Sequence, residues 1–487
     1  MIINNKNTNI YKKIDLLLWF MWGFSCLIIV PYIDFFSISI QLMEVFNLLV
    51  FASIFLNISL NKRGSNCKRV NMSLIILLVL YALAVFWPIG GVITVYHLGY
   101  IPRVSTFFVP FARLFIIITL FLAYIYFDAK EWQLRERALL KGFIVGCIVT
   151  VIWMVVEHIM FIILQIPINK YIFEDVLNMD VKHTFINILG AGFLGIPFDL
   201  YRATGFSWDP GMVAPLVVLG WLTYNLLSDI FIGKYRLWVS CVLLLSLPLS
   251  LSRTATLGTV IMCIIIFISE FLGCSFANIF QINVRNKQTC KYYYTGIHIK
   301  SIIFAFILTI VLLFILFTYK NLSISMFLKG MLNFINDIFT DQSPGTQRHL
   351  TYYKLIPEAL FLNLPAFLLG YGAMNVGVSM EILGIGILPG IENFISLWQG
   401  KWNPESMTVT FALMGGIVTL LAFTICIGIC LVVTFIKYLK RPWNKQYLSY
   451  FIILLAPFVL GMGYGIDNHI VFIMIFLMIV HICTNNS

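Results

Sequence analysis

Of the 487 residues in this chain, 60% are hydrophobic, 16% are aromatic and only 11% are charged. A water-soluble globular protein is excluded, because such proteins carry about 25% charged residues; the composition predicts an all-α polytopic membrane protein. The formal net charge of +11 arises mainly in short segments between apolar runs, so it indicates membrane topology and does not indicate nucleic-acid binding.

Apolar runs of roughly 17 to 25 residues, the length that a bilayer requires, recur along the chain. We expect residues 1–487 to form a single membrane domain of about twelve spans, near 15–32, 35–60, 72–90, 108–127, 139–166, 211–228, 236–251, 254–273, 300–319, 407–436, 446–463 and 466–483. Lys and Arg gather in alternate connections, beginning with the N-terminus. By the positive-inside rule, both termini are expected in the cytoplasm.

Two connections on the predicted external side are much longer than the others. Residues 167–210 end in Arg202-Ala203-Thr204-Gly205-Phe206, just before a span. Residues 320–406 are longer than a simple connection needs to be, and apolar residues at helical spacing in their first part predict helices in the membrane interface. We therefore expect a large, partly helical external loop.

Three arginines, Arg202, Arg253 and Arg348, lie on the side where basic residues should be scarce. A guanidinium group stays charged and presents a planar fork of donors, so converging arginines form a receptor for phosphate or pyrophosphate. The alternatives are exposed loop charges for Arg202 and Arg348, and for Arg253 a side chain that reaches back to the headgroups.

The segments around these arginines resemble a known family. Arg202-Ala203-Thr204-Gly205-Phe206 before a span, Ser252-Arg253-Thr254 between two spans, and Gln347-Arg348 followed by Gly370-Tyr371-Gly372 are similar, in this order, to motifs of the O-antigen polymerase (Wzy) and O-antigen ligase superfamily of bacterial membrane glycosyltransferases. The resemblance covers roughly residues 200–440. It implies a C-type glycosyltransferase (GT-C) architecture in the bacterial cytoplasmic (inner) membrane, with an active site that faces outward.

The resemblance further implies that Arg202, Arg253 and Arg348 bind the pyrophosphate of an undecaprenyl-pyrophosphate-linked oligosaccharide. A polymerase would join such lipid-linked repeat units into O antigen, capsule or exopolysaccharide, whereas a ligase would move the glycan to another acceptor. Ligases typically place a histidine before a polar residue near the span that follows the long loop; this chain keeps Asn403 there but lacks the histidine, which favours a polymerase. Membrane lipids, a flippase and a chain-length regulator are further candidate partners.

A flippase for lipid-linked oligosaccharides, or another transporter, would have a similar composition. Transporters usually keep ionisable residues at mid-membrane and show paired repeats. The predicted spans here carry few charges, mainly Glu44, Arg113, Glu157 and Glu270, and show no clear repeat. A glycosyltransferase is the better prediction.

Glycan transfer also needs a base and contacts to the sugars. Glu405 is the first candidate for the base, although a helix N-terminus also favours a carboxylate there; His349 next to the catalytic candidate Arg348, His469 and Asp467 are alternatives. The side chains expected to contact the glycan are Trp208, Trp402, Asn403 and Tyr371, although tryptophans also anchor at membrane interfaces. Because the chain lacks an Asp-x-Asp pair, we expect a metal-independent reaction without a cofactor.

Overall fold

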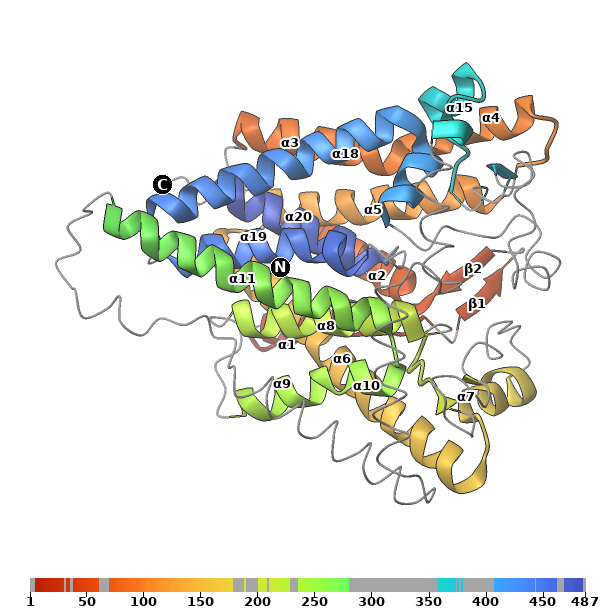
Figure 1. Ribbon diagram of the computed structural model, residues 1–487. Helices are drawn as coiled ribbons and strands as arrows, with labels where there is room; N and C mark the ends of the chain where they lie inside the picture. Colours follow the sequence, from red (N-terminus) through yellow and green to blue (C-terminus); the bar gives the residue numbers. More distant parts are fainter. Residues whose placement is uncertain are drawn as a thin grey trace.

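The computed structural model describes residues 5–29, 32–35, 38–60, 70–102, 104–177, 188–189, 200–207, 210–227, 235–279, 357–373, 375, 378–379, 407–442, 444–461 and 468–484. These residues are mostly helical (Figure 1). Six of their helices are long and apolar enough to cross a membrane: Leu42–Ser59, Met72–His97, Thr106–Tyr126, Ala129–Leu164, Thr254–Gly273 and Thr408–Lys440. Shorter apolar helices cover Gly211–Leu226, Arg236–Ser250, Lys445–Leu460 and His469–Thr484. This architecture agrees with the predicted all-α membrane protein.

The helices follow the expected apolar runs closely. In the first part of the chain they are α1 (Asn5–Ser25), α2 (Leu42–Leu60), α3 (Met72–Phe86), the 3-10 helix η1 (Trp87–Gly90), α4 (Gly91–His97), α5 (Ser105–Tyr126), α6 (Ala129–Leu164), α7 (Ile168–Lys170) and the π-helix η2 (Tyr171–Val176). The later helices are α8 (Pro210–Leu226), α9 (Arg236–Leu244), α10 (Ser246–Ser250), α11 (Arg253–Ile279), α15 (Leu364–Leu369), α18 (Met407–Lys440), α19 (Lys445–Leu460) and α20 (His469–Thr484). The expected run at 300–319 lies outside the described residues.

The structure differs from the expected elements at two places. The span expected at 35–60 begins only at Leu42, because strands β1 (Tyr32–Phe35) and β2 (Ile38–Gln41) form an antiparallel hairpin before it. The expected connection before residue 139 is already part of α6, which starts at Ala129. Asp128 caps this helix by accepting a hydrogen bond from the Glu131 N–H, at 2.7 Å.

Close helix packing and a buried central helix form the core of the bundle. A Cβ added to Gly23 of α1 would lie 1.9 Å from the Leu139 carbonyl oxygen of α6, so glycine permits the close approach of the two backbones. The residues from Ile470 to Val480 of α20 are all buried. A helix that is apolar on every side belongs in such a core, and α20 lies among α5, α18 and α19 (Figure 1).

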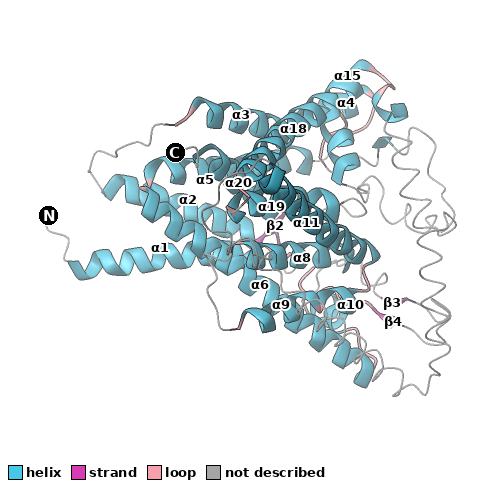
Figure 2. Ribbon diagram, turned by 60° about the vertical axis from the view of Figure 1, so that its left-hand side comes forward, coloured by secondary structure: helices cyan, strands magenta, loops and turns pink. Residues whose placement is uncertain are grey.

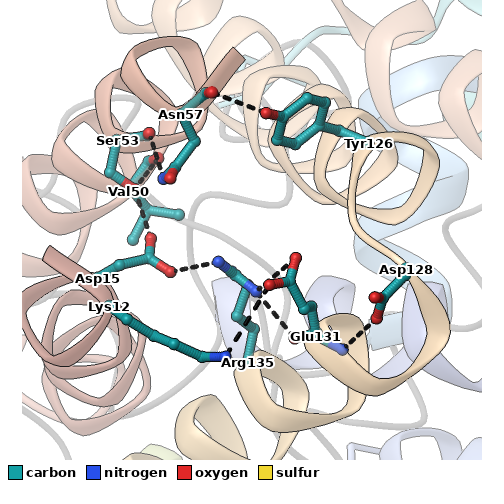
Figure 3. A network of polar contacts seen from close by, with 9 residues as sticks. All are labelled: Lys12, Asp15, Val50, Ser53, Asn57, Tyr126, Asp128, Glu131 and Arg135. Carbon is teal, nitrogen blue, oxygen red and sulfur yellow. Dashed lines mark hydrogen bonds and ion pairs between the residues drawn. The ribbon is translucent and has the colours of Figure 1, made fainter. Parts of the chain in front are cut away.

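One end of the bundle collects four cations and is called the basic end: the exposed Lys12 and the buried or partly buried Arg135, Arg236 and Lys437. Arg135 Nη2 lies 2.7 Å from Asp15 Oδ2, which joins the first turns of α6 to the middle of α1 (Figure 3). Lys437 Nζ donates to the Ile482 carbonyl oxygen at 3.0 Å and joins the ends of α18 and α20. These residues come from the segments that the charge pattern predicts to face the cytoplasm.

The opposite end of the bundle contains Arg202, the first of the three predicted arginines, and is called the loop end. It comprises residues 26–29, residues 200–207 and the start of α20. Asn468 Nδ2 donates to the Cys26 carbonyl oxygen at 3.0 Å, and the Ile29 N–H donates to the Phe206 carbonyl oxygen at 2.9 Å. Figure 2 shows the small hairpin of β3 (Ile188–Leu189) and β4 (Leu200–Tyr201) beside α10, far from the start of α1.

Candidate functional site

The loop that carries Arg202 is held by a carboxylate from within the bundle. Glu157, in the last third of α6, is 0% exposed. Its Oε1 accepts a hydrogen bond from the Gly205 N–H at 2.6 Å. Its Oε2 accepts from the Thr204 N–H at 3.1 Å and from the Tyr201 hydroxyl at 2.9 Å. One buried carboxylate thus binds the loop on both sides of Arg202.

A buried amide holds the same loop from another side. Asn169 Nδ2 donates to Thr204 Oγ1 and to the Gly205 carbonyl oxygen, both at 2.8 Å. Its Oδ1 in turn accepts from Trp153 Nε1 at 2.8 Å. The Trp153 ring stacks on Phe206, with ring centroids 5.4 Å apart. Polar and aromatic contacts together fix residues 204–206.

Gly205 is required by the shape of this turn. Its φ of +61° lies in the left-handed region that L side chains rarely adopt. A Cβ at this position would also lie 2.4 Å from Thr150 Cγ2 of α6. The glycine of the Arg202 motif therefore has a structural explanation that does not depend on family resemblance.

The Tyr201 hydroxyl donates its hydrogen bond to Glu157 over the whole neutral pH range. Burial, together with the neighbouring Glu157 carboxylate, raises the pKa of the Tyr201 hydroxyl above its usual value. The phenol therefore stays protonated at neutral pH and donates its hydrogen bond. Its ring stacks on Phe161, with centroids 4.8 Å apart, so the start of the loop is anchored by both the ring and the hydroxyl.

The structure brings the Arg202 side chain to the turn that precedes Arg253. Arg202 is partly buried, and its Nε donates to the Ser250 carbonyl oxygen at 3.2 Å. The next residue, Ala203, donates its N–H to the Leu249 carbonyl oxygen at 3.0 Å. Ser250 ends α10, and Arg253 is the first residue of α11. Two of the three predicted arginines therefore belong to segments that meet at the loop end.

The α10–α11 turn is itself well ordered by local contacts. Leu251 takes a left-handed conformation with φ of +49°, which reverses the chain after α10. Ser252 Oγ then accepts a hydrogen bond from the Ala255 N–H at 3.3 Å, as a residue that caps a helix N-terminus does. This cap places the N-terminus of α11, with its partial positive charge, beside the Arg202 loop.

Tyr371 has a packing role in the structure. Its side chain is 0% exposed, and its hydroxyl donates to the Ala359 carbonyl oxygen at 2.7 Å. Burial raises the pKa of Tyr371 to about 12. Its N–H donates to the Leu413 carbonyl oxygen in α18 at 2.8 Å. A ring so enclosed presents no face to a sugar in this conformation, so the geometry does not support the expected glycan contact.

Glycines that pack against the segment around Tyr371 allow three segments to approach one another. A Cβ on Gly91, at the start of α4, would lie 1.9 Å from the Gly372 backbone nitrogen. Within α18, Gly416 interrupts the helix with φ of +63°, and a Cβ there would lie 2.5 Å from the Phe367 carbonyl oxygen. Residues 370–372 thus form a close-packed junction of α4, α15 and α18.

Several predicted site residues lie outside the described residues: Arg348, His349, Glu405, Trp208, Trp402, Asn403 and Asp467. The alternative base His469 is described and lies at the loop end, where its Nε2 is 3.8 Å from Glu44 Oε1. Glu44 Oε2 also accepts from the Gln41 N–H at 2.9 Å. Within the described ranges no group of three His, Cys, Asp or Glu side chains could hold a metal ion.

Two residues of the candidate site were not recognised from the sequence. Glu157 stood out only as a charge within an apolar run, which is expensive unless the charge finds partners; the sequence did not show that the partners are Thr204 and Gly205. Asn169 carried no signal at all, because a single asparagine after a span is ordinary. Their partners in the Arg202 loop lie 35 to 48 residues away in the chain.

No family model and no curated protein matches this chain. The resemblance to the polymerase and ligase superfamily therefore rests on the three arginine motifs and on their order.

Proposed function

We propose that this protein is a Wzy-type glycan polymerase with about twelve spans and a GT-C-like architecture. In this reaction a glycan passes from an undecaprenyl-pyrophosphate carrier to a lipid-linked repeat unit on the outer side of the bacterial cytoplasmic membrane. The observation that carries the proposal is the contact of Arg202 with Ser250, because it joins the loop of one arginine to the turn that precedes another.

The arginines act on the leaving group. The acceptor hydroxyl attacks the anomeric carbon of the donor glycan, the bond from that carbon to the pyrophosphate oxygen breaks, and the electron pair leaves with the pyrophosphate. Fixed guanidinium groups stabilise this developing charge. The N-terminus of α11, which starts at Arg253, adds a favourable field for an anion. Pyrophosphate leaves well, so the protein needs no acid to protonate it.

The proton of the acceptor hydroxyl passes to a base. Glu405 remains the first candidate and His349 the second, as the sequence suggests. Among the described residues, His469 is the alternative, and its Nε2 lies 3.8 Å from Glu44 Oε1. A base at the loop end would lie at the same end as Arg202.

Polymerase is preferred to ligase because Asn403 has no histidine before it. The arginines serve either reaction equally, since both use the same type of donor. The two reactions differ in the acceptor, and an experiment on whole cells separates them.

The test is deletion of the gene, followed by analysis of surface glycan and of lipid-linked glycan. A polymerase predicts single repeat units in place of long chains, and restoration of long chains by the wild-type gene but not by Arg202→Ala. Long chains that persist on the lipid carrier without reaching the surface would instead indicate a ligase. Repeat units trapped on the inner face of the membrane would indicate a flippase.

A further inference from the structure

We propose that Glu157 is a positioning residue that holds Arg202 in place for binding a pyrophosphate group. This inference rests on the proposed function of Arg202. Its physical basis, a carboxylate within an apolar helix that binds the loop on either side of the arginine, is independent of that function.

Glu157 occupies a position that is costly for a carboxylate without partners. A carboxylate that is 0% exposed within a long apolar helix is strongly unfavourable unless donors surround it. The donors come from one short segment, the Tyr201 hydroxyl and the N–H groups of Thr204 and Gly205. The loop and the carboxylate therefore depend on each other.

The contacts of Glu157 are with the neighbours of Arg202 in the loop. Glu157 binds the residues around Arg202 and leaves the guanidinium to other partners. The described acceptor of the Arg202 Nε–H is a neutral carbonyl oxygen, that of Ser250, at 3.2 Å. This contact orients the side chain without cancelling its charge, so the remaining donors of the guanidinium can serve an anionic ligand.

The loop is also fixed on a second side. Asn169 binds Thr204 Oγ1 and the Gly205 carbonyl oxygen, and the Ala203 N–H binds the Leu249 carbonyl oxygen. Contacts from α6, from the segment after it and from α10 thus define the position of the loop. A site that must stabilise a leaving group gains from such rigidity, because catalytic donors work best when they are already in place.

The substitution Glu157→Gln tests the inference with little change in volume. The amide replaces one oxygen by an NH₂ group, so at least one donor of the loop then faces another donor. The matched control is Glu136→Gln. Glu136 is also buried in α6, but it lies at the basic end, where it pairs with His481.

The first measurement follows release of the loop without any need for activity. Purified protein in lipid nanodiscs is treated with trypsin, and mass spectrometry follows cleavage after Arg202, with the exposed Lys12 as the internal reference. Cleavage of a briefly opened segment reports how often it opens. For Glu157→Gln we expect cleavage after Arg202 to rise about tenfold or more, since a buried donor of the loop loses its acceptor. Glu136→Gln is expected to match the wild type.

A second variant keeps the test decisive if Glu157→Gln does not reach the membrane. Tyr201→Phe keeps the carboxylate and removes one of its donors, and we expect a smaller rise in cleavage after Arg202. Wild-type cleavage in every recovered variant would overturn the inference.

The second measurement connects the loop to function by complementation of the gene deletion. We expect Glu157→Gln to shorten the glycan chains, to do so less than Arg202→Ala, and to add nothing when combined with Arg202→Ala. If Glu157→Gln raises cleavage after Arg202 but leaves the glycan chains at their normal length, the positioning role is overturned and the proposed function is unaffected. Failure of the wild-type gene itself to restore chains would instead contradict the proposed function, and the trypsin result would still decide whether Glu157 holds the loop.

Discussion

Arg202 donates a hydrogen bond from its Nε to the Ser250 carbonyl oxygen at 3.2 Å, across 48 residues of sequence. This contact links the loop after β4 to the turn between α10 and α11, where Arg253 begins a helix of 27 residues. The contact therefore brings together the two segments that carry Arg202 and Arg253.

Replacement of Arg202 by alanine is expected to lower the rate of glycan transfer by about a hundredfold or more, the usual effect of losing a donor to a developing negative charge. Arg202→Lys should recover only part of the rate, because lysine keeps the charge but lacks the planar fork. Rates are measured with purified protein and a lipid-pyrophosphate-linked repeat unit. The control Arg137→Ala, at an exposed position near the start of α6, should retain wild-type activity. Equal activity in Arg202→Ala and the wild type would refute the assignment.

Arg202 and Arg253 should act on the same leaving group. Residues that work as a unit show effects that are far from additive. We therefore expect the double variant Arg202→Ala/Arg253→Ala to lose much less than the product of the two single losses. The measurement is the transfer rate of the four proteins in a double-mutant cycle. Fully multiplicative losses would show that the two arginines act independently.

Gly205→Ala is expected to destabilise the protein by about 1–3 kcal/mol, because alanine is strained at φ of +61° and its Cβ meets Thr150 Cγ2. When Thr150→Ser is added to Gly205→Ala, the obstructing methyl group is removed and the hydroxyl is kept. The double variant should therefore recover the stability lost to the steric clash but not the stability lost to backbone strain. Thermal unfolding in detergent gives the comparison. A Gly205→Ala protein as stable as the wild type would contradict this description of the turn.

Tyr371 should affect stability more than glycan binding. Tyr371→Phe removes the hydrogen bond to the Ala359 carbonyl oxygen and should cost about 1 kcal/mol, whereas Tyr371→Ala leaves a cavity and should cost about 3–5 kcal/mol. Thermal unfolding measures both. A stable Tyr371→Ala protein with a raised KM for the glycan acceptor would restore the glycan-contact prediction.

The same tyrosine predicts a pH effect on stability. Its pKa in the folded protein is about 12, above the value of about 10 in an unfolded chain. The unfolded state loses its proton first, so this stabilising contribution is fully present below about pH 10 and is lost as the pH rises towards about 12. The free energy of unfolding of the wild-type protein, measured across this pH range, should fall by an amount that Tyr371→Phe does not show. Identical pH profiles for the two proteins would rule out the contribution.

At the basic end, the buried ion pair of Asp15 and Arg135 should matter for stability alone. Asp15→Asn leaves the Arg135 charge buried without its 2.7 Å partner and should cost about 3–5 kcal/mol. Lys12→Ala disrupts only the exposed 3.9 Å pair with Glu131 and should cost about 1 kcal/mol or less. Both variants should keep the transfer rate per folded molecule. A large rate loss in correctly folded Asp15→Asn protein would show that the basic end takes part in function.

Most helices could be predicted from the sequence because an apolar run of sufficient length has few other stable structures in a bilayer. The boundaries were less predictable. α2 begins later than expected because Tyr32–Phe35 and Ile38–Gln41 pair as an antiparallel hairpin and do not join the helix. α6 begins earlier than expected because Asp128 caps it before a stretch rich in charges.

The candidate site was predictable only in part. Arg202 and Arg253 stood out because each is a charge in an unexpected place, but the meeting of their segments depends on a contact over 48 residues that no local pattern encodes. The role of Glu157 was hidden for the same reason. The glycines beside Tyr371 indicated a close backbone approach to a neighbour or to a ligand, and the structure shows close packing against α4 and α18.

The most direct test of the central claim is synthesis of a glycan ladder by purified protein from a lipid-pyrophosphate-linked repeat unit. The proposed function predicts a ladder of increasing chain length with the wild-type protein and with Glu136→Gln, and single repeat units alone with Arg202→Ala. A wild-type protein that leaves the repeat unit unchanged, in preparations that remain folded and membrane-embedded, would contradict the claim.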